Sequence, residues 1–359
     1  MANQVNIIGI GTYLPKKIVR NSDFNYASVG LTDEAIKKLG LVERRHADIH
    51  EGIIDLAYNA SLRAIKNARI SASDIDLILF ASASIEKIVP VPAIDIQKRL
   101  GIIDCMSLQF VDGCCAFLTS MEMGAYAIMS GQAKNVLIVS AERFSGKISF
   151  TTELSYLTGM SVGDSAGAMI LSCGDRKLGN GKLSSYFNSS PDFRAGFTIR
   201  PCEATIGLEK KCGIFLDYDF ESVLNGYQDD MSIASFFQRI KEHGLKLLPN
   251  CISKALNKVS YTDDDIDFYI LHQPTREFIE IWKQNANIHK NKTLDTFDKY
   301  ANLSSVTVVA NLDMAYQLGK IKKGDTILLA SLGEGITVGA TIWKWQLEKD
   351  DEHCYLISE

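Results

Sequence analysis

The feature that most constrains the fold of this 359-residue chain is an internal repeat. Residues 61–79 read SLRAIKNARISASDIDLIL and residues 252–270 read ISKALNKVSYTDDDIDFYI, so matching positions lie 191 residues apart. A second pair, KNVLIVSA at 134–141 and GDTILLAS at 324–331, keeps nearly the same spacing, 190 residues. Helix-plus-strand units resemble one another by chance, but a constant spacing between two such pairs indicates duplication. The sequence therefore predicts two duplicated halves.

Each half alternates helical periodicity with short apolar runs. Helical spacing over 53–69 precedes the run LILFASAS at 77–84, and a helix predicted over 116–130 precedes the run NVLIVSAE at 135–142. Short, nearly continuous apolar runs are typical of strands that are buried on both faces of a central sheet. We therefore expect an α/β fold in which helices cover both faces of the sheets.

Composition and charge exclude several classes of protein. The net charge of −5 and the lack of a basic segment argue against nucleic-acid binding. No apolar run approaches the roughly 20 residues of a membrane span, and the N-terminus lacks the basic start of a secretory signal. Eight cysteines without a CxxC pair predict neither a zinc site nor a disulfide framework. We expect a cytoplasmic protein with reduced thiols, no bound metal and no membrane span.

Two adjacent cysteines, Cys114 and Cys115, lie where a short apolar run meets a predicted helix. The free amides and dipole of a helix start favour a thiolate, although a free cysteine is more often a small buried hydrophobe. The local residues do not choose between the two cysteines. The repeat places Cys114 opposite a loop that contains Asn302, Ser304 and Ser305. If a pseudo-twofold axis relates the halves, the two loops should approach each other.

Among six histidines, only His272 ends a predicted buried strand, which is where functional residues gather in α/β folds. A structural role is the alternative for a single histidine. Together with Cys114 and Asn302, however, His272 forms a set with coherent chemistry. A thiolate can attack an acyl carbonyl while an imidazole and a carboxamide donate hydrogen bonds to a developing oxyanion.

These residues make the chain resemble the thiolase-fold condensing enzymes, specifically the beta-ketoacyl-ACP synthase III branch. The stretch CCAF, from Cys114 to Phe117, is similar to the family's Cys-x-Gly-Phe elbow, and LHQ, from Leu271 to Gln273, is similar to its His-Gln motif. Further matches are GLVERR at 40–45, GDSAGA at 163–168 and GEG at 333–335. The matches follow the family's order and span roughly residues 5–345.

The resemblance implies a thiolase-like fold, with two duplicated α/β halves in a layered α-β-α-β-α core. It divides the chain into an N-terminal half over 1–175 and a C-terminal half over 231–359. The range 176–230 is longer than is usual for the branch. We expect it to be an insertion that caps the substrate pocket, with a longer surface loop as the alternative.

The resemblance also implies roles for the site residues. Cys114 would accept the acyl group, and His272 and Asn302 would hold the oxygen of the attacking enolate. The amides of Cys114 and of the turn formed by Gly333, Glu334 and Gly335 would hold the oxyanion of the thioester.

Two residues at this turn, Leu332 and Glu334, differ from the family's pattern. Leu332 stands where the family has an aromatic residue associated with malonyl decarboxylation. Glu334 could therefore remove an α-proton from an unactivated acceptor, or it could point to solvent. Leu332 and Phe117 are the residues that we expect to contact substrate.

The function implied by the resemblance is a Claisen condensation between the acyl group on Cys114 and a second acyl thioester. Both substrates would be carried on the phosphopantetheine of an acyl carrier protein or of coenzyme A, with no other cofactor, in a homodimer. The reaction would belong to the biosynthesis of fatty acids, polyketides or other specialised metabolites. One hypothesis is that the product closes to a ring, as in the subgroup that forms cyclohexanediones and dialkylresorcinols. An acyltransferase that acylates a hydroxyl or amine with the same triad, and a noncatalytic ketosynthase partner subunit, are the alternatives.

A carrier protein is acidic, so its docking would need a local basic surface on this acidic chain. Arg239, Lys241 and Lys246 on one predicted helix, with Arg276 after the His-Gln motif, could provide it. A solvated charged face without a partner is the alternative.

Overall fold

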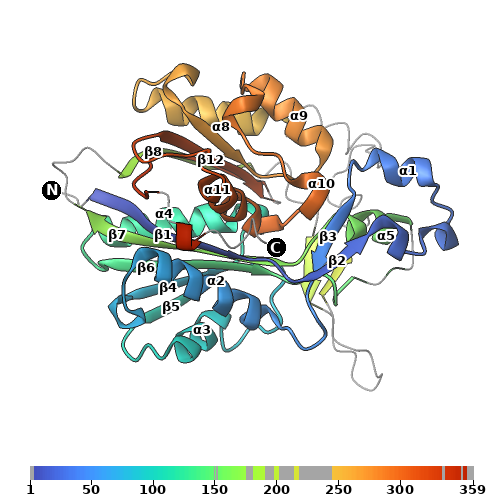
Figure 1. Ribbon diagram of the computed structural model, residues 1–359, viewed down its shortest axis with the longest axis horizontal. Coiled ribbons are helices and arrows are strands. Elements are labelled where there is room, and N and C mark those ends of the chain that lie inside the picture. Colours follow the sequence, from blue (N-terminus) through green and yellow to red (C-terminus); the bar gives the residue numbers. More distant parts are fainter. Residues whose placement is uncertain are drawn as a thin grey trace, which may run out of the picture.

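The chain folds into five layers of alternating helices and sheets (Figure 1). The structure is a computed structural model, and it describes residues 4–148, 150, 153–174, 181–190, 198–201, 214–217, 245–333, 336–348 and 351–353. The layered α-β-α-β-α architecture confirms the predicted fold class.

The first sheet has five strands in the order β1-β7-β6-β4-β5. Strand β4 lies parallel to both β5 and β6, whereas β7 is antiparallel to both β6 and β1. The strands are β1 (Gln4–Tyr13), β4 (Leu77–Ala81), β5 (Met106–Phe110), β6 (Asn135–Glu142) and β7 (Ser165–Gly174). The apolar runs predicted at 77–84 and 135–142 thus form the centre of the sheet, as their lack of alternation indicates.

The second sheet repeats this pattern with four strands in the order β11-β12-β13-β8. Strand β11 is parallel to β12, and the pairs β12–β13 and β13–β8 are antiparallel. A parallel bridge from Tyr269 to Thr293 occupies the place that β5 holds in the first sheet. The strands are β8 (Gly181–Ser189), β11 (Phe268–Leu271), β12 (Thr326–Gly333) and β13 (Thr337–Lys344).

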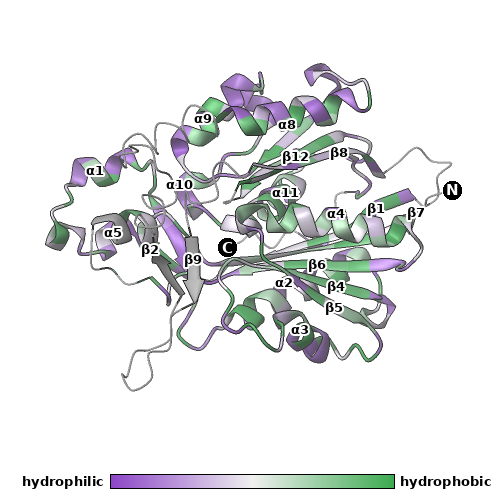
Figure 2. Cartoon of the chain, turned by 180° about the vertical axis from the view of Figure 1, so that it is seen from behind, coloured by the Kyte–Doolittle hydropathy of each residue, from purple (hydrophilic) through white to green (hydrophobic). Residues whose placement is uncertain are grey.

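Helices fill the three remaining layers. Helices α2 (Ile53–Ala68) and α3 (Pro92–Leu100) cover the outer face of the first sheet, and α8 (Leu245–Asn257) and α9 (Arg276–Asn285) cover that of the second. Helices α4 (Ala116–Met129) and α11 (Thr307–Gln317) lie between the sheets in the largest hydrophobic core. Figure 2 shows the corresponding pattern, with hydrophobic residues along the inner strands and hydrophilic ones on the outer surfaces of α8 and α9.

The duplication is visible in the local structure. Asp76 Oδ2 accepts a hydrogen bond from Asn135 N at 2.9 Å, and Asp267 Oδ2 accepts the equivalent bond from Thr326 N at 2.7 Å. Asp76 and Asp267 lie 191 residues apart, and so do Asn135 and Thr326. The 190-residue spacing predicted for the second pair of segments is therefore wrong by one residue. The carboxylates tie each strand to its neighbour in the same way, which confirms the repeat.

The predicted boundary of the second half needs a correction. Strand β8, at 181–189, lies inside the range that we assigned to an insertion, yet it is an edge strand of the second sheet. In the remainder of 176–230 the structure describes residue 190 and a two-stranded ribbon of β9 (Thr198–Pro201) and β10 (Ile214–Asp217). That this segment caps a pocket stays a prediction.

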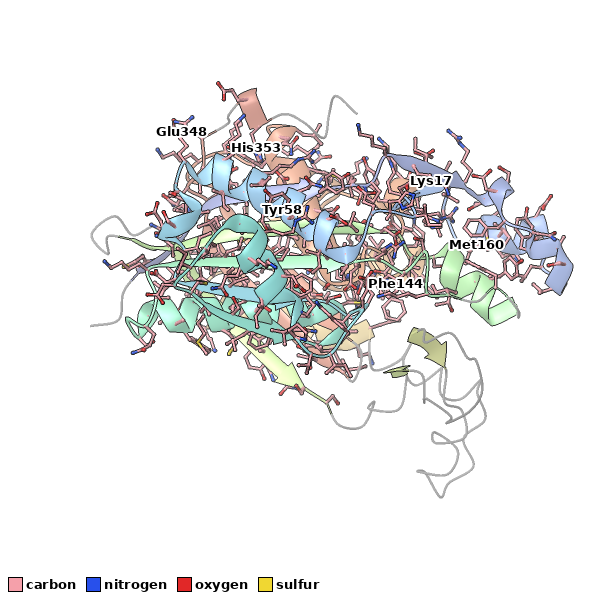
Figure 3. The ribbon with its side chains drawn as sticks, turned by 90° about the horizontal axis from the view of Figure 1, so that it is seen from below. Lys17, Tyr58, Phe144, Met160, Glu348 and His353 are labelled. Carbon is pink, nitrogen blue, oxygen red and sulfur yellow. The ribbon has the colours of Figure 1, made fainter. Side chains whose placement is uncertain are left out.

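A smaller unit projects from one end of the layers (Figure 1). It contains β2 (Lys17–Arg20), β3 (Glu43–His46), α1 (Asp33–Lys38), α5 (Glu153–Met160) and, beside the second half, α10 (Phe297–Tyr300). Arg44 joins β3 to α5 and to the residue after β2, because its buried guanidinium donates hydrogen bonds to the carbonyl oxygen of Met160 and to Asn21 Oδ1. Figure 3 shows Lys17 and Met160 together at this end, with His353 and Glu348 far from them.

Candidate active site

Cys114 lies on the turn that joins the first sheet to the central helix α4. Strand β5 ends at Phe110, a 3₁₀ turn η4 covers Gly113–Cys115, and α4 begins at Ala116. Gly113 adopts a φ of 51°, which a residue with a Cβ adopts only at a cost in energy. The turn therefore presents Cys114 beside the N-terminal amides of the helix, as the sequence predicted.

The environments of the two cysteines differ. Cys114 is partly exposed, whereas Cys115 is completely buried, and burial raises the pKa of the Cys115 thiol well above its usual value. Cys115 Sγ lies 3.9 Å from the carbonyl oxygen of Ser331 in the core. A buried thiol that stays protonated is a poor nucleophile, so Cys114 is the better candidate.

The counterpart loop of the second half faces this turn, as the repeat predicted. A second 3₁₀ turn, η10 (Ser304–Val306), contacts η4, and Ser304 Oγ lies 3.6 Å from Cys114 Sγ. The turns η4 and η10 lie 191 residues apart, and each precedes a central helix.

Asn302 is held rigidly just before this turn. Its backbone N–H donates to Ser161 O at 2.9 Å, and its carbonyl accepts from Gly163 N at 3.1 Å. Its side-chain Oδ1 accepts from Ser304 N at 2.7 Å. This bond holds the side chain by its acceptor oxygen, and the Nδ2 group is the donor that it can offer to a substrate oxygen.

His272 follows β11 and is 1% exposed. Its backbone N–H donates to Ala330 O at 2.9 Å, and neither ring nitrogen has a hydrogen-bond partner among the described residues. Burial lowers the pKa of the ring to about 3, so the imidazole is neutral at physiological pH. A neutral ring with an unpaired N–H can donate one hydrogen bond to a substrate oxygen without carrying charge.

Strand β12 connects His272 to the cysteine turn. The hydroxyl of Ser331, which follows Ala330, donates to the carbonyl oxygen of Cys114 at 2.8 Å. A Cβ at Gly333 would lie 2.5 Å from Asp112 O and 2.8 Å from Cys115 N, so only glycine permits this close approach. The structure thus brings Cys114, Ser304 and Asn302 together. It places His272 just after β11, the strand that pairs with β12, and β12 contacts Cys114.

The other predicted site residues have mixed outcomes. Leu332 is buried beside Gly333, and Phe117 is buried in the central hydrophobic core, so a substrate contact for either stays a prediction. Glu334, Gly335, Arg239 and Lys241 lie outside the described residues.

The two described members of the predicted docking surface are Lys246 on α8 and Arg276 on the neighbouring α9. The Arg276 guanidinium already pairs with Asp295 and lies over the Phe297 ring. Its charge is therefore partly neutralised within the chain, which weakens its role in docking.

Sequence reasoning missed a buried carboxylate behind the site. Glu142, at the end of β6, is fully buried and accepts hydrogen bonds from the hydroxyls of Ser82, Ser84 and Ser305 and from Ala83 N. The repeat spacing could have pointed to it, because it aligns Glu142 with Gly333 beside the cysteine turn.

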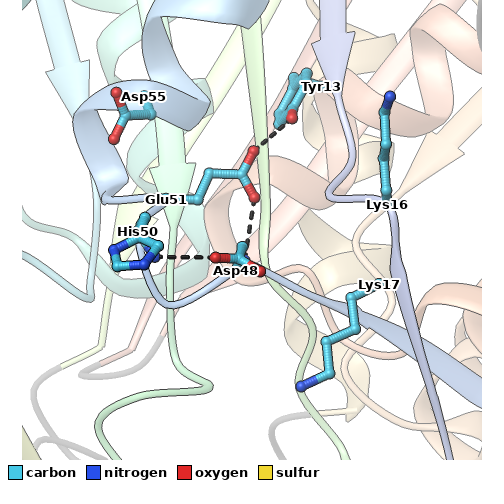
Figure 4. A pocket seen from close by; sticks show the side chains of 7 residues that line it. All are labelled: Tyr13, Lys16, Lys17, Asp48, His50, Glu51 and Asp55. Carbon is cyan, nitrogen blue, oxygen red and sulfur yellow. Dashed lines mark hydrogen bonds between the residues drawn. The ribbon is translucent and has the colours of Figure 1, made fainter.

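A separate polar pocket lies between β1, the start of β2 and the start of α2 (Figure 4). Its lining residues are Tyr13, Lys16, Lys17, Asp48, His50, Glu51 and Asp55. Three of them bond to one another, because the Glu51 carboxylate accepts from the Tyr13 hydroxyl and from Asp48 N. This pocket contains none of the predicted site residues.

Two further searches cover only the described part of the chain. In it, no group of three or more His, Cys, Asp or Glu side chains could hold a metal ion. No helix in that part is long and apolar enough to cross a membrane.

Comparisons with known proteins point to one family. Residues 109–191 match the family model for 3-oxoacyl-[acyl-carrier-protein (ACP)] synthase III, and residues 256–345 match the model for its C-terminal part. The beta-ketoacyl-[acyl-carrier-protein] synthase III of Staphylococcus aureus strain Newman is 32% identical over 343 residues, which are 95% of this chain and 99% of the relative.

Solved structures show the same fold. The 3-oxoacyl-[acyl-carrier-protein] synthase III of Aquifex aeolicus VF5 has a TM-score of 0.79 at 24% identity, and the match covers 95% of this chain and all of that one. A cysteine-to-serine variant of Xanthomonas campestris OleA, with bound lauric acid and lauroyl-CoA, also has a TM-score of 0.79, at 20% identity over 96% of this chain and all of that one. The chain belongs to the beta-ketoacyl-[acyl-carrier-protein] synthase III family and is a condensing acyltransferase with a thiolase fold.

Proposed function

We propose that Cys114 accepts an acyl group and that His272 and Asn302 activate the second substrate for Claisen condensation. One observation carries this assignment: the partly exposed Cys114 sits on a helix-start turn, in contact with the loop that fixes Asn302. The neutral ring of His272 supports it, because neither ring nitrogen bonds to a described residue and the ring N–H can therefore donate to substrate.

In the loading step, the Cys114 sulfur attacks the carbonyl carbon of an acyl thioester. The C–S bond to the carrier breaks, and the carrier thiolate leaves and takes up a proton from water. The backbone amides of Cys114 and of the turn over 333–335 would hold the oxyanion of the tetrahedral intermediate. Losing one such donor raises a barrier by about 3 kcal/mol.

In the condensation step, the acceptor thioester becomes an enolate whose oxygen receives hydrogen bonds from His272 and Asn302. Its α-carbon attacks the acyl carbon, the new C–C bond forms, and the Cys114 sulfur leaves as a thiolate. A neutral His272 suits this role, because its one N–H can donate to the enolate oxygen without placing a positive charge in the buried site.

The acceptor is the part of the reaction in which this chain departs from its family. We infer that it uses an unactivated acyl thioester, from which a base removes the α-proton, and not a malonyl thioester that loses CO₂. The support is Leu332, which is buried beside Gly333 at the position of the aromatic residue associated with decarboxylation. Glu334 is the candidate base, and the proposal extends to ring closure of the product.

The carriers, assembly and location are proposals too. We expect the acyl groups to arrive on an acyl carrier protein or coenzyme A. An open sheet edge at β5, with exposed Met106 and Leu108, supports a homodimer, which sedimentation would detect. Free cysteines in the described part of the chain, such as Cys105 and Cys173, support a reducing cytoplasm, which localisation of a tagged protein would check.

Product analysis by mass spectrometry tests the proposed reaction. The protein is incubated with an acyl-CoA alone, and separately with the acyl-CoA plus malonyl-CoA or a malonyl carrier protein. We expect a β-keto product from the acyl thioester alone, and its loss in Cys114→Ala but not in the matched control Cys115→Ala. Product that appears only with malonyl donors would refute the acceptor, and acylated alcohol or amine without a new C–C bond would refute the condensation.

A further inference from the structure

We propose that Ser304 is a catalytic residue whose hydroxyl donates a hydrogen bond to the Cys114 thiolate. The inference deepens the proposed function, because it rests on Cys114 as the nucleophile. It assigns chemistry to the counterpart loop of the second half.

The contact itself is the first observation. Ser304 Oγ lies 3.6 Å from Cys114 Sγ, within hydrogen-bond range for sulfur, and the serine is 4% exposed. Among the described residues, the Ser304 hydroxyl has no other hydrogen-bond partner. The hydroxyl of a buried serine usually finds a partner, and here the described partner is the sulfur.

The backbone of Ser304 is the second observation. Its φ is 50°, in the left-handed region, where glycine is favoured over a residue with a Cβ. The residue at the same place in the first half is Gly113, with a φ of 51°. The second half thus carries a strained serine where the first half carries an unstrained glycine. Strained residues of this kind gather at functional sites, and this one contacts the reactive atom.

The surroundings hold the hydroxyl in place. Ser304 N donates to Asn302 Oδ1 at 2.7 Å, and Ser304 O accepts from Thr307 Oγ1 at 2.9 Å. The next residue, Ser305, bonds to Ser140 Oγ and to the buried Glu142 carboxylate. The turn is therefore anchored on both sides, and the side chain of Ser304 is directed at the sulfur without a cost in ordering at each turnover.

The titratable groups described near the sulfur leave a role for such a donor. His272 is neutral, so it cannot form an ion pair with the thiolate. The other titratable groups on the cysteine turn are Asp112, whose carboxylate accepts from Thr119 Oγ1, and the buried thiol of Cys115. None of the three supplies positive charge. The start of α4 and the Ser304 hydroxyl both favour negative charge on the Cys114 sulfur.

The hydrogen bond favours the two states in which the sulfur is charged. The first is the free thiolate before loading, and the second is the thiolate that leaves when the new C–C bond forms. In the acyl-enzyme the sulfur belongs to a neutral thioester and accepts only weakly. The donor therefore stabilises the charge that develops at both chemical steps.

The pH dependence of Cys114 alkylation by iodoacetamide, with the alkylated residue located by tandem mass spectrometry of the digested protein, tests the proposal. We expect the midpoint of the profile to rise by about one pH unit in Ser304→Ala, which is about a tenfold loss of thiolate below the midpoint. Ser304→Gly removes the same hydroxyl and also relieves the backbone strain, so it should shift equally. The matched control is Ser331→Ala, which removes a hydroxyl that contacts the carbonyl oxygen of Cys114 and not its sulfur; its midpoint should not move.

Two outcomes would overturn the proposal. One is that the alkylation profiles of both Ser304 variants coincide with that of the wild type. The other is that the midpoint shifts in Ser304→Ala but not in Ser304→Gly, because the shift would then come from the strained backbone and not from the lost hydroxyl. Circular dichroism of each variant checks that it is folded. The proposed function fails differently: condensation that survives in Cys114→Ala refutes the nucleophile whatever the Ser304 variants show.

Discussion

At the scale of single residues, the site depends on neutral hydrogen-bond donors around one partly exposed thiol. Cys115 is buried and protonated, His272 is buried and neutral, and Ser304 and Asn302 are fixed by the turn that carries them. Uncharged donors can stabilise negative charge on either the sulfur or a substrate oxygen as the reaction proceeds.

Burying His272 in its neutral form has a consequence for stability. Its folded pKa of about 3 lies below the unfolded value of about 6.5, so between these values the unfolded chain binds more protons. Stability from this group is present above pH 6.5 and is lost as the pH falls through the window. At pH 4.5 the loss is about 2–3 kcal/mol.

Urea unfolding at pH 7.5 and pH 4.5 measures this effect against His272→Asn, which cannot titrate. We expect the wild type to lose about 2–3 kcal/mol more than the variant between the two pH values. Equal losses in the two proteins would show that His272 is protonated or exposed in the folded state.

At the scale of secondary-structure elements, a buried carboxylate holds the two halves of the site together. Glu142 ends β6 in the first half, and its partner Ser305 lies in η10 of the second half. The carboxylate accepts from three hydroxyls and one amide, and this explains how a charge is tolerated where the exposed fraction is zero.

Glu142→Gln keeps the shape of the side chain but replaces one acceptor oxygen with a donor. We expect a loss of about 2–4 kcal/mol in the free energy of unfolding, because buried donors lose their partner. Urea denaturation measures it, with Glu34→Gln as the control, since Glu34 is an exposed partner of Lys38. A loss within about 0.5 kcal/mol of the control's would contradict the account, since that much is usual for surface changes.

At the scale of the whole molecule, the repeat predicted more than any single motif. It placed η10 opposite η4, and the structure confirms the approach through the contact of Ser304 with Cys114. Apolar runs predicted β4 and β6, because strands buried on both faces need no polar alternation.

Other features could not be predicted because they depend on contacts between distant segments. Strand β8 is polar at many positions and half-buried at an edge, so its sequence GKLSSYFNS does not read as part of a core sheet. Glu142 looks like the polar end of a strand until Ser84 and Ser305 are seen to surround it. Family resemblance chose Cys114 over Cys115, and the exposed fraction of each side chain supplies the physical reason.

The most direct test of the central claim is to locate the acyl group on the loaded enzyme. The protein is exposed briefly to an acyl-CoA and digested, and the acylated peptide is sequenced by tandem mass spectrometry. The account predicts one acyl group, attached to Cys114, present in Cys115→Ala and absent from Cys114→Ala. An acyl group on any other residue, or an undiminished adduct in Cys114→Ala, would contradict it.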